Sequence, residues 1–366
     1  MNHTSQTITV VTTALVLGLA AQAGPLEPPG PPGSTMRTLD EIYMEIQHTL
    51  DRVVDTLGAV VDNEDRLMDL QQQVEALEHN QQILQQRIQG MEQRMQVAGM
   101  LQMRGDMVLI PGGTNEGTDP DFGAYSLTID SFYMDQYPVT KALWDAIREW
   151  ALENGYTDLP AGGGKGPDHP VHSVNWYDAV KWCNARSERD GLIPVYGHWI
   201  AATPPDYLLY GVYRTGEPTH TDVNQDTSAN GYRLPTGTEW EYAARGGLSG
   251  RRFPWDDANT VQHTRANYQS RTEEAYDTSS TQGYHEAYWT GGVPYTSPVG
   301  SFAPNGYGLY DMAGNVSEWC WNPQGALRQV RSGGWSSYAH WLRCGSVGGS
   351  GPSNAHHNRG FRSVCR

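Results

Sequence analysis

Cysteine is scarce in this chain of 366 residues. The four that occur, Cys183, Cys320, Cys344 and Cys365, show no CxxC or other zinc-type spacing, so a cysteine-ligated metal cluster is not expected. Basic residues are also in deficit, because 25 Lys and Arg stand against 41 Asp and Glu, a formal net charge of −16. Since nucleic acids and anionic membranes are bound through neutralising cations, this balance argues against nucleic acid as a partner.

Phenylalanine is rare, with 5 residues, whereas the chain has 12 Trp, 20 Tyr and 41 Gly. Trp and Tyr can pack a ring while their N–H or O–H reaches the backbone, which suits a core built largely from loops. The composition therefore predicts a globular part with much irregular structure.

Long hydrophobic runs are missing except at residues 8–23, where a short apolar stretch ends in Ala21-Gln22-Ala23. A small-x-small site after such a run is typical of a secretory signal peptide, which we expect at 1–23. The run is shorter than a membrane span requires, so we expect no transmembrane span in the mature chain and a secreted, periplasmic or cell-surface location. The start MNHTSQ lacks Lys and Arg, and an N-terminal membrane anchor is the alternative. Export would permit disulfides.

Residues 24–35 are rich in Pro and Gly and are expected to form a linker. Proline is then absent from 36 to 97, and apolar residues recur at alternating steps of three and four, which predicts a coiled-coil helix over 36–98. The expected state is a homo-oligomer, with a helical hairpin folded on itself as the alternative. The periodic positions are Leu70, Val74, Leu77, Leu84, Ile88, Met91 and Met95, with Gln81 in the series, and upstream, in a shifted frame, Ile46, Leu50, Val53, Leu57 and Val60.

Residues 105–366 have few long periodic runs and predict an α+β domain with much irregular structure. A short strand is expected at 107–110. Three helices are expected at 140–153, 176–186 and 236–245, and the last opens on Thr236 with Glu239 three residues on, a capping-box pattern.

Several phrases of this domain are distinctive in their order: MVLIPGG (107–113), SFYMDQYPVTKALW (131–144), HPVHSVNWYDAVKWCNARS (169–187), GYRLPTGTEWEYAARGG (231–247), FPW (253–255), SPVGSFAPNGYGLYDMAGNVSEWCW (297–321), RSGGW (331–335) and NRGFR (358–362). Together they resemble the formylglycine-generating enzyme, or sulfatase-modifying factor, family. The resemblance covers nearly all of 105–366 and implies a variant of the C-type-lectin fold.

The phrase DMAGNVSEW (311–319) combines two carboxylates with a glycine-containing turn, a set of hard oxygen donors that suits calcium. The resemblance implies structural calcium held by side-chain oxygens of Asp311 and Glu318 and by the carbonyls of Gly314 and Val316. It also implies a second calcium site that begins at Asn267. The alternative is a solvated turn in which Asp and Glu act as caps.

Catalytic members of the family bind copper through two cysteines five residues apart, and here those positions fall at Ser337 and near Leu342. Copper(I) is soft and requires thiolates, so no copper is expected, and a non-catalytic member is favoured over an enzyme. The resemblance implies that Cys183 pairs with Cys365, which would leave Cys320 to pair with Cys344. The residues alone leave all three connectivities open.

The C-terminal stretch 335–358 is rich in Tyr, Ser, Gly, His and Asn, a mixture of aromatic area and small adaptable donors that antibody-type binding loops use. It resembles the diversified segment of variable proteins from diversity-generating retroelements; an ordinary surface of a non-catalytic family member is the alternative. The candidate binding residues are Trp335, Ser336, Ser337, Tyr338, His340, Trp341, Ser346, Ser350, Asn354, His356 and His357.

Two functions follow. The first is a secreted, non-catalytic protein that binds a protein or carbohydrate through 335–358 on a calcium-stabilised scaffold and a coiled-coil stalk. The second is a sulfatase-maturing or related protein-modifying oxidoreductase.

Overall fold

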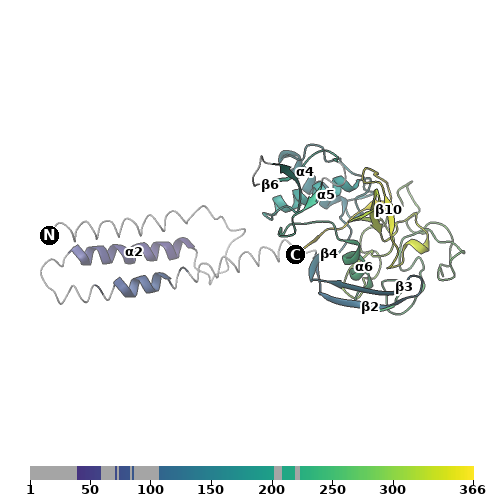
Figure 1. The fold of residues 1–366 in the computed structure, drawn as a ribbon, viewed down its shortest axis with the longest axis horizontal. Coiled ribbons are helices and arrows are strands. Elements are labelled where there is room, and N and C mark those ends of the chain that lie inside the picture. Colours follow the sequence, from purple (N-terminus) through teal and green to yellow (C-terminus); the bar gives the residue numbers. More distant parts are fainter. Residues whose placement is uncertain are drawn as a thin grey trace. The chain divides into compact units, whose positions relative to one another are not determined.

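The computed structural model describes residues 39–58, 71, 74–82, 85, 107–201, 208–218 and 223–366. The chain divides into two units, Met1–Arg94 and Met95–Arg366 (Figure 1). The predicted signal peptide at 1–23 and linker at 24–35 lie outside the described residues. Within those residues, no helix combines the length and apolar character needed to cross a membrane.

The N-terminal unit contains the helix α2 (Leu39–Gly58), and residues 74–82 are also helical. Val74, Leu77 and Gln81 are half-buried while the residues between them are exposed. Ile46 and Leu50 are half-buried in α2 in the same way. Both segments are thus amphipathic at helical spacing, as the sequence predicts. The rest of the predicted seam lies outside the described residues.

Among its described residues, the C-terminal unit combines three α-helices with short strands and long connections (Figure 1). The helices are α4 (Lys141–Glu153), α5 (Trp176–Arg189) and α6 (Gly237–Arg245). The strands are β1 (Met107–Ile110), β2 (Gly113–Asp119), β3 (Gly123–Ile129), β4 (Phe132–Asp135), β5 (Tyr196–Ala201), β6 (Leu208–Val212), β7 (Asn224–Gln225), β8 (Ser317–Gln324), β9 (Leu327–Arg331), β10 (Gly348–Ser350), β11 (Arg359–Gly360) and β12 (Val364–Cys365), with a short 3-10 helix η1 (Ala339–Trp341).

The helix starts are fixed by side-chain caps. Thr140 accepts the N–H of Leu143 at the start of α4, and Thr236 with Glu239 forms the expected capping box of α6. A second capping box opens α5, where Asn175 and Asp178 exchange hydrogen bonds. Because each cap satisfies backbone donors that a helix end leaves open, the short helices are defined even though most of the domain is irregular.

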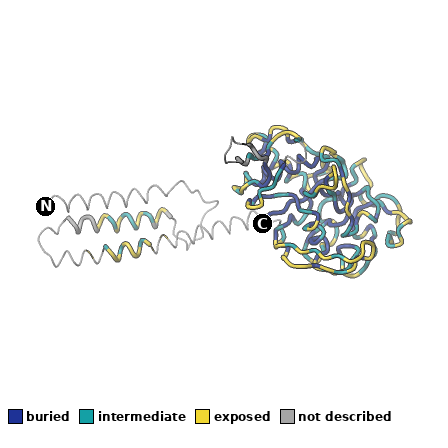
Figure 2. Tube along the Cα trace, in the orientation of Figure 1, coloured by how far each residue is buried: buried dark blue, intermediate teal, exposed yellow. Residues whose placement is uncertain are grey.

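The largest core cluster is built on aromatic rings from distant parts of the chain. The indoles of Trp144 in α4 and Trp182 in α5 stack with centroids 5.9 Å apart. Phe361, near the C-terminus, meets both edge-on, at 6.1 and 5.3 Å. All three are fully buried. Figure 2 shows buried segments running through the interior of the C-terminal unit. The end of the chain is therefore anchored in the centre of the domain.

Four strands carry the C-terminal stretch, in the order β10-β9-β8-β11. β9 pairs with β8 and with β10 in antiparallel register, and β11 runs parallel to β8. The last strand, β12, joins a different sheet beside β4. The segment between β9 and β11 is thus fixed at both ends and by β10 in its middle.

Candidate ligand-binding surface

The segment after β9 turns sharply before it reaches the domain surface. Ser332 and Gly333 both have positive φ, 74° and 67°. Gly334 is held at close quarters, since a Cβ there would lie 2.8 Å from the carbonyl oxygen of Asn358. Trp335 follows with 2% exposure, and its indole N–H donates to the carbonyl of His357 at 3.3 Å. Trp335 therefore ties the two halves of the C-terminal stretch together.

Three of the eleven predicted binding residues are buried, which corrects the prediction for them. Trp335 is an anchor of the fold, and Ser346 and Ser350 are 4% and 6% exposed. The hydroxyl of Ser346 donates to the carbonyl of His340, whereas Ser350 lies in β10, opposite Arg328 of β9. Composition indicated exposed serines, but strand pairing and the turn after η1 turn them inward.

The other eight lie at the surface and are called the binding surface below. Trp341 is 41% exposed and Asn354 is exposed as well, while six are half-buried. The rings of Tyr338, His340 and Trp341 follow one another at 6.1 and 5.2 Å, and His356 stacks on His357 at 4.2 Å. The binding surface consists of Ser336, Ser337, Tyr338, His340, Trp341, Asn354, His356 and His357.

Two partners of this surface come from a segment that the sequence did not assign. The carboxylate of Glu274 lies 2.6 Å from Nδ1 of His340. The guanidinium of Arg271 lies over the ring of Tyr338 and contacts its hydroxyl. Both residues lie between the family phrases at 253–255 and 297–321. A contact of this kind leaves no mark in a single sequence, because the residues are more than sixty positions apart.

The resemblance places the two copper positions of catalytic family members at Ser337 and near Leu342, and the structure shows other groups there. The hydroxyl of Ser337 accepts the backbone N–H of Gly334 at 2.9 Å, and Leu342 is fully buried in a small apolar cluster. Cys344 lies two residues on, also buried, and burial raises the pKa of its thiol to about 12. Among the described residues, no three His, Cys, Asp or Glu side chains converge in a way that could hold a metal ion.

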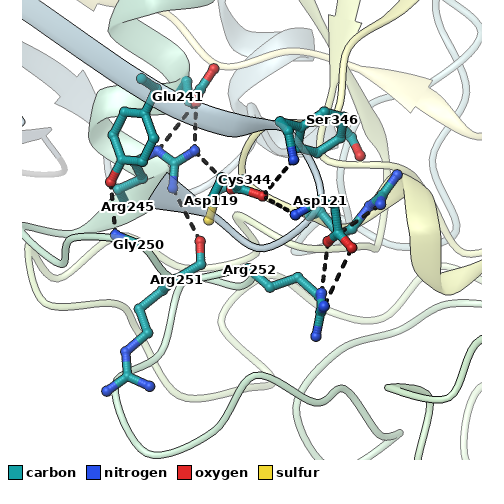
Figure 3. Close-up of polar contacts among 12 residues, drawn as sticks. Asp119, Asp121, Glu241, Arg245, Gly250, Arg251, Arg252, Cys344 and Ser346 are labelled. Carbon is teal, nitrogen blue, oxygen red and sulfur yellow. Dashed lines mark hydrogen bonds and ion pairs between the residues drawn. The ribbon is translucent and has the colours of Figure 1, made fainter. Parts of the chain in front are cut away.

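Cys344 sits in a charged cluster that fixes the base of the C-terminal stretch (Figure 3). Arg245 of α6 pairs with Asp119 at the end of β2 (3.0 Å) and with Glu241 (2.7 Å). Arg331 bonds the carbonyls of Cys344 and Ser346. The cluster thus joins the β2–β3 hairpin, α6 and residues 344–346.

The four cysteines are buried, and none of them forms a disulfide bond. The predicted pairings of Cys183 with Cys365 and of Cys320 with Cys344 are therefore absent from this structure. The members of each predicted pair do belong to the same hydrophobic cluster. The thiol of Cys365 lies 3.8 Å from the sulfur of Met107.

The predicted calcium loop follows a strained backbone path, since Asp311 and Asn315 have φ of 55° and 63°. One carboxylate oxygen of Asp311 accepts the N–H of Gly300 at 2.8 Å. Its other oxygen, Oδ1, is buried and has no hydrogen-bond partner. Burial raises the pKa of Asp311 to about 6. The loop therefore holds a buried carboxylate oxygen that a cation could satisfy.

Glu318 has a second role that the sequence did not indicate. Its carboxylate accepts two hydrogen bonds from Arg362, both 2.8 Å, and one from the indole of Trp240 at 2.7 Å. Glu318 and Arg362 are both fully buried. A calcium ion at Glu318 would have to share this carboxylate with Arg362.

Asn267 lies against the same loop rather than in a remote place. Its carbonyl accepts the N–H of Asn315 at 2.8 Å, and its side-chain oxygen is buried without a partner. Asn315, which begins an Asn-Val-Ser sequon, is fully buried with its amide bonded to the backbone of Ser297. A glycan cannot be accommodated there.

Comparison with known proteins gives consistent matches. The family model described as a sulfatase-modifying factor enzyme 1-like domain matches residues 94–366. The formylglycine-generating enzyme of Streptomyces coelicolor is 36% identical over 301 residues, covering 70% of this chain and 87% of that protein. The inactive C-alpha-formylglycine-generating enzyme 2 of Mus musculus is 31% identical over 285 residues, covering 70% and 84%. Among solved structures, Treponema denticola variable protein 1 matches with a TM-score of 0.53 and 26% identity, over 71% of this chain and 94% of that one.

Proposed function

The chain belongs to the sulfatase-modifying factor family, and we propose that it is a non-catalytic, ligand-binding member. The observation that carries this proposal is the pair of residues at the copper positions. The hydroxyl of Ser337 accepts a hydrogen bond from the backbone N–H of Gly334, and Leu342 is fully buried. Neither can supply the thiolate that copper(I) requires, and burial holds the pKa of the Cys344 thiol at about 12.

The relatives include proteins that favour each of the two functions. The variable protein of Treponema denticola and the inactive mouse relative share the domain. The Streptomyces coelicolor protein, named as a formylglycine-generating enzyme, supports the alternative of a protein-modifying oxidoreductase. The two functions separate in one assay on the full chain. We expect no stoichiometric copper(I) binding and no oxidation of a CxPxR-type peptide. If the chain both bound copper(I) and oxidised the peptide, the enzymatic function would be supported instead.

The ligand is a protein or a carbohydrate that contacts the binding surface. Tyr338 and Trp341 offer rigid aromatic area, and the serines and asparagine around them offer adaptable hydrogen bonds. The test is a screen of immobilised full-length chain against glycan and peptide libraries, repeated with Trp341→Ala. We expect that variant to weaken binding of any true ligand by about tenfold or more, since interface tryptophans are often hot spots. A ligand indifferent to Trp341 and Tyr338 would argue that the binding surface lies elsewhere.

Genetic diversification of this surface is a separate part of the proposal. It predicts a near-copy of the coding sequence for 331–362 that differs only at adenines and lies beside a reverse-transcriptase gene. A genome search that finds no such copy would count against diversification and leave the binding function in place.

We further propose that calcium stabilises the scaffold at the 311–318 loop. The unpartnered buried oxygen of Asp311 supports this, and that of Asn267 supports the second calcium site, because calcium prefers several oxygen ligands of modest geometric precision. Gly314, Val316 and Glu318 would complete the set. Bound there, calcium would neutralise buried carboxylate charge. Export of the chain and its oligomerisation through 36–98 complete the proposal, and both rest on the sequence patterns.

A further inference from the structure

Arg359 differs from most other arginines of the domain in its surroundings. The buried arginines Arg186, Arg245 and Arg362 each have a carboxylate at 2.7 to 3.0 Å. Arg359 is half-buried, yet within the described residues no carboxylate lies within 4.0 Å of it. Burial, with no neighbouring charge contributing, lowers the pKa of its guanidinium to about 10. Removing a charge from water without a counter-charge costs stability, which suggests that Arg359 has a role other than stabilising the fold.

The guanidinium of Arg359 is held in a defined place. It lies over the fully buried indole of Trp319, 4.7 Å from the ring centroid. Its Nη1 donates to the hydroxyl oxygen of Ser350 at 2.7 Å and to the carbonyl of Asn354 at 3.3 Å. All of its hydrogen bonds to the described residues use this one nitrogen. One edge of the guanidinium therefore fixes the 350–354 loop, and the donors of Nη2 are left for another group.

Ser350 and Asn354 position the guanidinium. The Ser350 oxygen accepts from both Arg359 and the side-chain amide of Asn354, the latter at 3.3 Å. Because Ser350 is itself buried, its role is to hold Arg359 and the loop in place. Asn354 is exposed, so the group opens to solvent on the side of the loop.

A second guanidinium lies on the same face of the sheet. Arg328 stands directly opposite Ser350 in the β9–β10 pairing, and directly opposed residues project to the same face. Arg328 is 3% exposed and its guanidinium lies 3.8 Å from the ring centroid of Trp176. The face thus concentrates positive charge in a chain whose net charge is −16.

This arrangement selects a ligand with one localised negative charge. A polyanion would be repelled by the acidic molecule as a whole, whereas a single carboxylate would respond mainly to the nearby guanidinium in its low-dielectric setting. A carboxylate would accept a charge-assisted hydrogen bond from Nη2 of Arg359, since Nη1 is engaged by the loop and Nε is buried without a partner. We propose that Arg359, positioned by Ser350 and Asn354, is the recognition point for one carboxylate, an acidic side chain or the C-terminus, of a protein partner. The inference rests on the proposed binding function and specifies its ligand.

The test uses a phage-displayed random 12-residue peptide library selected on the full chain. The best peptides are synthesised with each carboxylate in turn replaced by its amide. We expect one carboxylate whose removal weakens binding to the wild-type chain about 30-fold or more, the loss typical of a broken charged pair. Arg359→Leu should cause the same loss. Once Arg359 is gone, removal of the carboxylate should cost nothing further, which is the signature of a direct pair in a double-mutant cycle.

The matched control is Arg251→Gln, which removes an equal charge from a residue with no contact to Ser350 and should change affinity less than about twofold, as expected for a charge outside the contact. If thermal unfolding shows that Arg359→Leu is not folded, Arg359→Gln replaces it in the double-mutant cycle. Amide substitutions that cost as much in the Arg359 variant as in the wild type would overturn the pairing. Peptides whose affinity falls with Trp341→Ala but not with Arg359→Leu would overturn this inference alone. If no selected peptide loses affinity with either variant, both this inference and the binding of protein ligands by this surface would be overturned.

Discussion

Single buried residues of this domain fall into two groups, those whose polar atoms are satisfied within the fold and those whose atoms are not. Glu318 belongs to the first, because Arg362 and Trp240 together give it three donors. Asp311 and Asn267 belong to the second, since each keeps a buried oxygen without a partner. Buried polar atoms left in this state cost roughly 1–3 kcal/mol each. A ligand that satisfies them would therefore stabilise the native state.

Calcium should raise the thermal stability of the full chain if it binds at Asp311. With free calcium at about 100 times its dissociation constant, linkage gives about 2.7 kcal/mol of stabilisation. The measurement is the unfolding midpoint in calcium and in EGTA, for the wild type and for Asp311→Asn. The variant should lose the calcium response but not its fold. An equal response in both proteins would place the ion elsewhere.

His172 should make the domain less stable in mild acid. Burial lowers its pKa from 6.5 to about 4, with further contributions from His357, His169 and Lys141. A folded-state pKa below the unfolded value means that the neutral ring stabilises the fold fully above pH 6.5, and that this stability is lost as the pH falls towards 4. The shift corresponds to roughly 3 kcal/mol at 1.36 kcal/mol per pKa unit.

Denaturant unfolding between pH 7.5 and 4.5 measures this effect, and His172→Gln is the comparison. The variant should have a visibly shallower pH dependence over that range. Burial also lowers the pKa of His285 and of His357, so some dependence should remain. Identical slopes for the two proteins would mean that His172 does not carry the effect.

At the scale of elements, the C-terminal stretch depends on contacts between pieces distant in sequence. Arg245 ties α6 to the β2–β3 hairpin through Asp119, and both side chains are almost fully buried (Figure 3). Removing one member of such a pair leaves the other charged and unsolvated, which typically costs 3–5 kcal/mol. Through Arg331, which contacts Glu241 and the carbonyls of Cys344 and Ser346, the cluster also reaches the C-terminal stretch.

Arg245→Met should accordingly destabilise the domain by about 3–5 kcal/mol in urea unfolding. The control is Arg265→Met, because Arg265 pairs with Asp257, whose side chain is 59% exposed. An exposed pair contributes about 0–1 kcal/mol, so the control should unfold close to the wild type. Similar losses in the two variants would contradict the importance assigned to burial.

What the sequence could predict at this scale was local. Thr236 and Glu239 signal their helix start within four residues, and the 107–110 strand is a short apolar run closed by Pro-Gly-Gly, so both predictions are confirmed. The family phrases identified the domain and its fold, because each phrase is a contiguous stretch of sequence that can be recognised without knowing its contacts. The burial of Ser350, the pairing of Glu318 with Arg362 and the position of Asn267 beside Asn315 were not predictable. Each depends on which distant segment lies opposite.

At the scale of the whole molecule, the two units of the chain differ in how they bury their apolar side chains. The C-terminal unit buries large aromatic rings around short elements. The helical segments of the N-terminal unit instead show a narrow half-buried stripe on otherwise exposed helices. A stripe of this width cannot bury itself on an isolated helix, so it requires a partner helix.

The partner is expected to come from another copy of the chain, with a hairpin in the same chain as the alternative. Leu70, Leu77 and Leu84 occupy one row of the heptad, and replacing all three with Asp would place charges where the helices meet. Sedimentation velocity should then show a homo-oligomer for the wild type and a monomer for this variant. The control adds the same three charges on exposed positions, as Gln71→Asp, Asn80→Asp and Gln82→Asp, and should remain oligomeric because an outward charge is solvated in both states. A wild-type chain that sediments as a monomer would favour the hairpin. An unchanged oligomer in the Leu variant would mean that the copies associate through some other surface.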